Sequence, residues 1–209
     1  MNAAKSAKGF IDMHPVIKEC IAKGLINYSE LARQVIAQQG LKGSDFDAVL
    51  VAVRRHAEKA KLRGSNEAAI LGLFRKSRLE IKDNVCSIVL DESVPFSFLT
   101  KLIGEINEKQ EPCHLIQGSR TFTLVTSQEF LPKIEKLFAG KVISAKKNLV
   151  QVVLRTGKEI ESTPGVAAYL YGLFAEHGIN IVETMSSWTE TLIVLDEKDL
   201  GRAMETLKF

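Results

Sequence analysis

The sequence has 209 residues, of which 45% are hydrophobic and 25% are charged. A chain of this length forms one large or several small folded domains, and it is too hydrophobic to be disordered. No apolar stretch approaches the roughly 20 residues that cross a bilayer, and the first ten residues lack the apolar core of a secretory signal. We therefore expect a soluble protein of the cytoplasm that has no membrane partner.

Cysteine usage and charge narrow the class further. Cys20, Cys86 and Cys113 have no CxxC spacing, so they predict buried, reduced thiols rather than disulfides or a zinc site. Residues 1–82 carry a net charge of +7 and residues 83–209 a net charge of −4, within an overall charge of +3. A basic N-terminal part can meet nucleic acid, another protein or the acidic half of its own chain, and charge alone does not choose among these.

The N-terminal part predicts a helical domain. Apolar residues recur at helical spacing in several segments, and Asn27 and Ser44 stand where they can cap two of the helices. The expected helices span residues 14–24, 27–39, 44–62 and 66–76. Strict alternation over 78–82 then predicts a strand. The first three helices, together with this strand, have the order of a winged helix-turn-helix. A docking or dimerisation domain can have the same helices.

The remaining sequence predicts two copies of one module. Strand patterns alternate with amphipathic helices in the order β-α-β-β-α-β over residues 83–146, and much the same order follows over 147–209. Pro95 and Pro164 each precede the first helix of a copy, at an offset of about 70 residues. This order indicates an α+β protein in which two helices pack on one face of a ferredoxin-like antiparallel sheet. The predicted domains are residues 1–82, 83–146 and 147–209.

A single segment of the second copy is the most informative. In the run STPGVAA, Pro164 suits a helix start, and Gly165 lets a ligand approach the backbone because it has no Cβ. The first free N–H groups of the following helix attract a carboxylate. Gly178 ends that helix, and we expect Asn180 to start the next strand, level with the helix N-terminus. There its amide could donate to and accept from a zwitterion.

These runs resemble the ACT domain, the small regulatory module of aspartate kinases, phosphoglycerate dehydrogenases and related enzymes. The STPGVAA, GINI and DEKDLGRAMETL runs lie within residues 149–207 and match the tandem ACT region of aspartate kinases especially well. The resemblance implies a ferredoxin-like fold, modules paired edge to edge, and an amino-acid effector bound at that pairing. The implied effector contacts are Ser162, Thr163, Pro164, Gly165, Val166, Ala167, Ile179, Asn180 and Ile181.

The first copy departs from this pattern. It has Val94-Pro95-Phe96 where the second copy has Thr163-Pro164-Gly165, and Pro112-Cys113-His114 where the second has Ile179-Asn180-Ile181. The Phe96 side chain would block the close approach that Gly165 allows. We therefore expect the first copy to be a degenerate, structural module and the second copy to hold the site.

The sequence does not predict an enzyme. Aspartate kinase activity needs a separate kinase domain, and the residues before the repeats are too few and too helical to supply it. The sequence has no P-loop, HExxH, GxSxG or dinucleotide-binding motif, so we expect no cofactor. Adjacent Cys113 and His114 would point to opposite faces of a strand, and we expect no metal site. We expect His177 on the inward face of its helix, packed in the core.

The expected function is that of a dimeric amino-acid sensor which controls either transcription or an amino-acid biosynthetic enzyme. The alternative is a non-sensing dimerisation protein that docks on a partner through its helical domain. If the helical domain binds DNA, the expected phosphate contacts are Arg33, Arg54, Arg55, Lys59 and Arg63. Against DNA binding, Asp45 and Asp47 stand at the start of the expected recognition helix, where carboxylates would repel phosphates.

Overall fold

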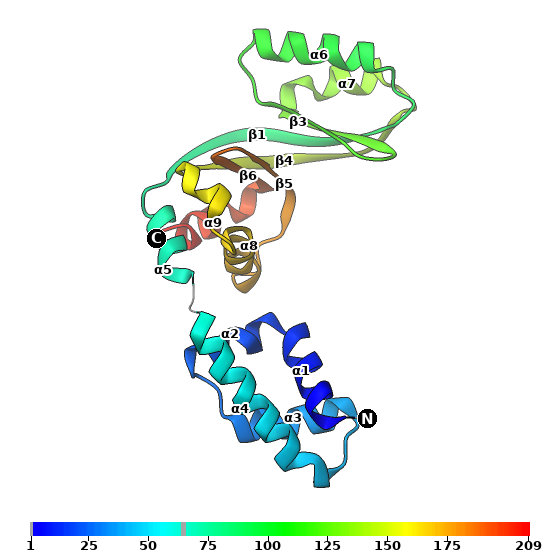
Figure 1. Ribbon diagram of the computed structural model, residues 1–209. Helices are drawn as coiled ribbons and strands as arrows, with labels where there is room; N and C mark the ends of the chain where they lie inside the picture. The colour runs from blue at the N-terminus through cyan, green and yellow to red at the C-terminus, as the bar shows by residue number, and fades with distance from the viewer. Residues whose placement is uncertain (1, 64–65) are drawn as a thin grey trace. The chain divides into compact units, whose positions relative to one another are not determined.

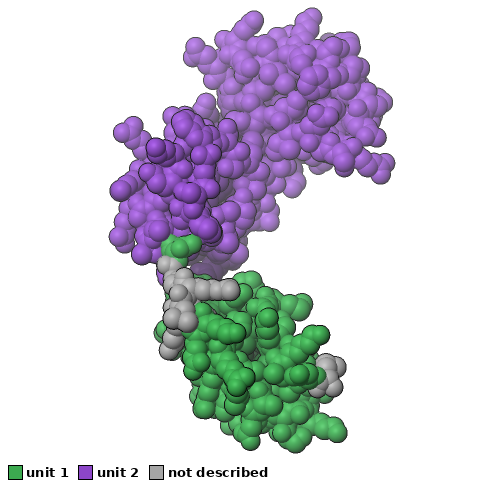
Figure 2. All heavy atoms as spheres, in the orientation of Figure 1, with its two compact units in different colours: residues 1–66 green, residues 67–209 purple. Residues whose placement is uncertain are grey.

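The computed structural model describes residues 2–63 and 66–209, without the side chains of residues 60–63 (Figure 1). The chain divides into a compact unit of residues 1–66 and a second of residues 67–209 (Figure 2). Within the described residues, no helix is long and apolar enough to span a membrane.

The first unit is a bundle of helices around an apolar core. Its elements are α1 (Ala3–Met13), α2 (Pro15–Lys23), α3 (Tyr28–Gln39), the short 3-10 helix η1 (Gly43–Asp45) and α4 (Phe46–Arg63). The last three α-helices correspond to those expected from the sequence. Asn27 caps α3 as expected, because its side chain accepts from the N–H groups of Ser29 and Glu30. Ser44 does not cap α4, because it lies inside η1, where Asp45 instead accepts from the Lys42 N–H at 3.0 Å.

Helix α1 was not expected from the sequence. The Asn2 side chain caps it by accepting from the N–H groups of Ala4 and Lys5. Its buried residues are Ala3, Ala7, Phe10 and Ile11, which lie on one face and join the core of the unit. Two of these four residues are alanine, so the helical spacing of large apolar residues is weak in the sequence. Packing against α4 supplies the stability that this local pattern lacks.

The second unit combines helices with a curled antiparallel sheet, which confirms the expected mixture of the two. Its elements are α5 (Glu67–Phe74), β1 (Arg78–Asp91), α6 (Phe96–Glu108), β2 (Cys113–Gln117), β3 (Thr121–Ser127), η2 (Gln128–Phe130), α7 (Leu131–Leu137), β4 (Val142–Arg155), η3 (Lys158–Ser162), α8 (Val166–Glu176), β5 (Ile181–Ser187), β6 (Glu190–Asp196), η4 (Glu197–Asp199) and α9 (Leu200–Thr206). The strand order is β2-β3-β1-β4-β6-β5.

Strands β1 and β4 are each 14 residues long and pair with each other along both halves of the sheet. The segment 78–82, which the sequence analysis placed in the helical domain, pairs with Gln151–Arg155 of β4. The strand that a winged helix would use as its wing therefore belongs to the sheet of the second unit. The expected division between residues 82 and 83 falls inside β1.

Both long strands change register at the same place. Asn84 and Asn148 adopt the left-handed conformation, with φ of 52° and 54°, on either side of the Val85–Leu149 pair. The N–H of Asn148 donates to the Gln128 Oε1 at 2.8 Å, which holds this bend against η2. Because a bulge bends a strand and increases its twist, two adjacent bulges curl the sheet here.

The curl brings the helix-free faces of the two halves together. Ser87 of β1 donates to Glu183 Oε1 of β5 at 3.1 Å, although β4 and β6 separate these strands in the sheet order. In a flat sheet, strands three places apart would lie roughly 14 Å from each other. Val85, Val125, Leu149 and Val194 form the buried core of this contact. His114 is half-buried at the same interface, where burial lowers the pKa of its imidazole.

Helices cover the outer faces of the curled sheet. α6 and α7 pack on the half that contains β2 and β3, while α8 and α9 pack on the half that contains β5 and β6 (Figure 1). Helix α5 also belongs to the second core, through Ile70, Leu73 and Phe74, although the sequence analysis placed it in the helical domain. Cys86 is buried, which raises the pKa of its thiol to about 11, and Cys20 and Cys113 are half-buried.

The bend generates a testable prediction. We expect Asn148→Val to lower the free energy of unfolding of the second unit by about 1–2 kcal/mol, because a β-branched residue is strained at positive φ. Asn148→Gly should cost less, because glycine adopts that conformation freely and keeps the N–H that Gln128 accepts from. Urea unfolding followed by far-ultraviolet circular dichroism measures both. Equal losses in the two variants would contradict the role assigned to the bend.

Candidate functional site

The loop before α8 is built around a left-handed glycine. Gly165 has φ of 96° and stands at the N-cap of α8, where it supplies no side-chain cap to the first N–H groups of the helix. A Cβ on Gly165 would lie 3.5 Å from Cδ1 of Ile70, in ordinary contact with α5. Gly165 is therefore required by the backbone conformation of the turn, and the side on which its Cβ would stand faces α5.

The residues before Gly165 form a compact turn. The hydroxyls of Ser162 and Thr163 both donate to the carbonyl oxygen of Glu159, at 3.3 and 2.7 Å. After the turn, Val166 is buried and Ala167 is exposed at the first turn of α8. Sequence analysis located this helix start correctly, because proline and glycine mark it strongly.

The second predicted segment lies at the other end of α8. Gly178 is left-handed, with φ of 63°, and the N–H of Ile179 donates to the Phe174 carbonyl at 2.9 Å to close the helix. Ile179 is buried, Asn180 is exposed, and β5 begins at Ile181. The eleven residues of α8 separate Gly165 from Asn180 by roughly 16 Å at 1.5 Å per residue. The expectation that Asn180 lies level with the helix N-terminus is wrong within one chain.

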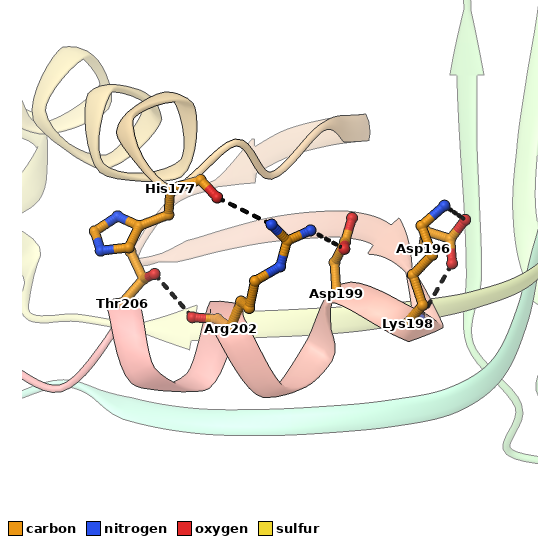
Figure 3. A network of polar contacts seen from close by, with 6 residues as sticks. All are labelled: His177, Asp196, Lys198, Asp199, Arg202 and Thr206. Carbon is orange, nitrogen blue, oxygen red and sulfur yellow. Dashed lines mark hydrogen bonds and ion pairs between the residues drawn. The ribbon is translucent and has the colours of Figure 1, made fainter.

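An arginine anchors the end of α8 to α9. Arg202 donates to the His177 carbonyl at 3.3 Å and forms an ion pair with Asp199, whose side chain is only 7% exposed (Figure 3). Within α9, the Thr206 hydroxyl donates to the Arg202 carbonyl at 2.8 Å. His177 itself is exposed, and its Nδ1 lies 2.8 Å from the Leu173 carbonyl, so the expectation of a packed core histidine is wrong.

A groove opens beside the same loop. It has a volume of about 710 Å³ and lies between α5, the start of β1, the end of β4 and η3. Ser162 and Thr163 line it, together with Lys76 and Arg78. Sequence analysis missed these two basic residues, because α5 is some 80 positions from η3 in the chain and only the fold brings them together.

The other predicted residues are more scattered. Phe96 is exposed at the start of α6 in the first half of the sheet, about 6.2 Å from the Phe122 ring. Of the predicted phosphate contacts, Arg33 forms an ion pair with Glu30 at 2.9 Å, and the others described are exposed on α4. Those exposed residues are Arg54, Arg55 and Lys59. The Arg63 side chain lies outside the described residues. In the part of the chain that the structure describes, no group of three or more His, Cys, Asp or Glu could hold a metal ion.

The chain is similar in fold to aspartate kinases. The aspartate kinase of Clostridium acetobutylicum, called an allosteric enzyme, matches 62% of this chain with a TM-score of 0.50 and 16% identity, over 33% of its own length. The regulatory subunit of Thermus thermophilus aspartate kinase matches 62% of this chain and 92% of its own, with a TM-score of 0.48 and 17% identity. The aspartokinase α and β subunits give 20% identity and a TM-score of 0.49, over 62% of this chain and 93% of theirs. The resemblance to aspartate kinases is confirmed at the level of the fold, through the match to a third of the Clostridium acetobutylicum enzyme.

Sequence comparison adds little to this. No protein-family model matches the chain. The error-prone DNA polymerase of Hahella chejuensis (strain KCTC 2396) is 26% identical over 148 residues. That match covers 64% of this chain but only 14% of the polymerase.

The anchor of α8 generates a prediction. We expect Arg202→Ala to lower the free energy of unfolding by about 1–3 kcal/mol, because the buried Asp199 carboxylate loses its cation. Adding Asp199→Asn should restore part of this loss, because a neutral amide costs less to bury. The matched control is Lys198→Ala, which removes an exposed ion pair with Asp196 and should change little. Urea unfolding of the three variants tests this, and similar losses for Arg202→Ala and Lys198→Ala would count against it.

Proposed function

We propose that the chain is a non-catalytic, amino-acid-sensing regulatory protein built on two ferredoxin-like ACT modules. The observation that carries the proposal is the fold shared with a third of the chain of an aspartate kinase that is called an allosteric enzyme. Strand order supports two modules. Around β1, the strands of the first half follow the order β2-β3-β1-β4, and around β4, those of the second half follow β5-β6-β4-β1. If the four strands of a βαββαβ unit are numbered along the chain, their order in its sheet is 2-3-1-4. Both halves have this order if Arg78–Lys82 of β1 serves as the fourth strand of the second module.

The effector site proposed for the second module needs two copies of the chain. The carboxylate of an amino acid would rest on the N–H groups at the start of α8, which have no side-chain cap. The ammonium group would meet Asn180, which lies at the opposite end of the same helix. β5 is an edge strand, so a second copy could pair with it in antiparallel fashion. That arrangement would bring Asn180 of one copy toward Gly165 of the other.

The helical unit would carry the response to a partner. The candidate partners are a DNA operator and an amino-acid biosynthetic enzyme, and two observations favour a protein partner. Met13, Val16 and Leu25 are large apolar side chains that stand exposed near the ends of α1 and α2. Asp47 lies in the first turn of α4, where a recognition helix would approach phosphates. We therefore propose that the helical unit binds a protein partner. Ligand binding would shift the population of module packings, and the helical unit would follow that shift.

An amino-acid screen tests the sensing function. We expect at least one common amino acid to raise the melting temperature of the full chain. A ligand at 100 times its Kd adds about 2.7 kcal/mol to the state that binds it. For a protein of this size, the gain corresponds to roughly 5 °C or more. Asn180→Ala should lose the shift, while Asn107→Ala, an equally exposed asparagine on α6, should keep it. No shift with any amino acid would favour the alternative, a non-sensing dimerisation protein.

A DNA titration tests the output. We expect no binding of the full chain to duplex DNA at 50 mM salt, measured by fluorescence anisotropy of a labelled duplex, because carboxylates stand at the start of α4. Binding whose log affinity falls with log salt by a slope of several units would contradict this expectation. If Arg54→Glu then abolished that binding, the helical unit would be a DNA-binding domain, and the protein a transcription regulator.

A further inference from the structure

The groove between α5 and η3 is lined by charged residues of both signs. Lys76 in the turn after α5 and Arg78 at the start of β1 supply two cations. Among the residues that the structure describes, neither forms an ion pair. Arg155, which also lines the groove, is already held by Glu80 and Glu190, each at 3.0 Å. The cations available to a ligand are therefore those of Lys76 and Arg78.

η3 and the residue after it offer acceptors. Ser162 and Thr163 use their hydroxyl protons on the Glu159 carbonyl, which leaves oxygen lone pairs for a ligand. The Glu159 carboxylate folds over Gly157, where a Cβ would collide with it. Within the described chain, this carboxylate has no ion-pair partner. The wall of η3 therefore suits an ammonium group, in contrast to the cationic wall of α5 and β1.

These two walls indicate the class of ligand. We propose that the groove binds an α-amino acid with a second carboxylate. The two available cations and the one available carboxylate can pair, group for group, with the two carboxylates and one ammonium group of such a ligand. The carboxylates would meet Lys76 and Arg78, and the ammonium group would meet Glu159 and the hydroxyl oxygens beside it. The volume of about 710 Å³ leaves room for bridging waters.

The groove differs from the effector site proposed at the paired modules. It lies within residues 67–209 of one chain and needs no second copy, and only Ser162 and Thr163 belong to both. The inference rests on the proposed function in taking the ligand to be an amino acid. Helix α5 is the first element after residue 66. A ligand that joins α5 to η3 would therefore act on the helix that directly follows the helical unit in the chain.

Calorimetric titration of the full chain tests the groove. L-Glutamate and L-aspartate are the probes, glutarate and succinate lack the ammonium group, and L-lysine reverses the charge. We expect binding of one acidic amino acid, with a Kd at least tenfold lower than that of its dicarboxylate analogue or of lysine. Lys76→Ala, Arg78→Ala and Glu159→Gln should each raise the Kd about tenfold or more. Arg75→Ala, an exposed neighbour outside the groove, should leave it unchanged.

The variants separate this inference from the proposed function. Binding that is lost in Arg78→Ala and kept in Asn180→Ala supports the groove. Binding that is lost in Asn180→Ala and kept in Arg78→Ala overturns the groove and leaves the sensing function standing. Equal affinity for glutamate and glutarate overturns the role of Glu159 and with it the amino-acid class. Absence of binding by any amino acid overturns both proposals. Far-ultraviolet circular dichroism verifies that each variant is folded.

Discussion

The two long strands bend together, and the architecture of the second unit depends on that bend. Asn84 and Asn148 take the left-handed conformation beside the same strand pair, so the sheet curls where its two halves meet. Residues that a flat sheet would keep far apart then touch, as Ser87 and Glu183 do. A buried apolar contact replaces solvent on the helix-free faces, which would otherwise expose Val125 and Val194. The helices consequently lie on the outside, where each half keeps its own core.

Helix α8 sets the geometry of the candidate effector site. Its N-terminus presents uncapped N–H groups after Gly165, and its C-terminus is held to α9 by the contact of Arg202 with His177. A rigid helix of this length keeps the two predicted segments apart, so the proposed site would need one segment from each of two copies. Sensing by this route therefore depends on assembly, and affinity for an effector would be coupled to the pairing of copies.

If the proposed groove binds a ligand, helix α5 would give the second unit a different means of response. Ile70 of this helix lies beside Gly165, and Lys76, in the turn that follows the helix, lines the same groove as Glu159. The loop before α8 thus lies between two candidate sites, one facing a second copy and one facing α5. An occupant of either would bear on the turn that Ser162 and Thr163 form with Glu159. This turn alone could therefore couple the two proposed sites.

Local signals in the sequence were sufficient for most elements and for the mixture of helices with an antiparallel sheet. Pro164 and Gly165 marked the start of α8, Asn27 marked that of α3, and alternation marked the strands, because capping and periodicity act between near neighbours. Long-range arrangement was decided by tertiary packing. The joining of 78–82 to the later sheet and the position of Arg78 and Glu159 in one groove both depend on segments far apart in the chain. Pairing of such segments is set by the register of β1 on β4 and by burial at the curl, neither of which leaves a period in the sequence.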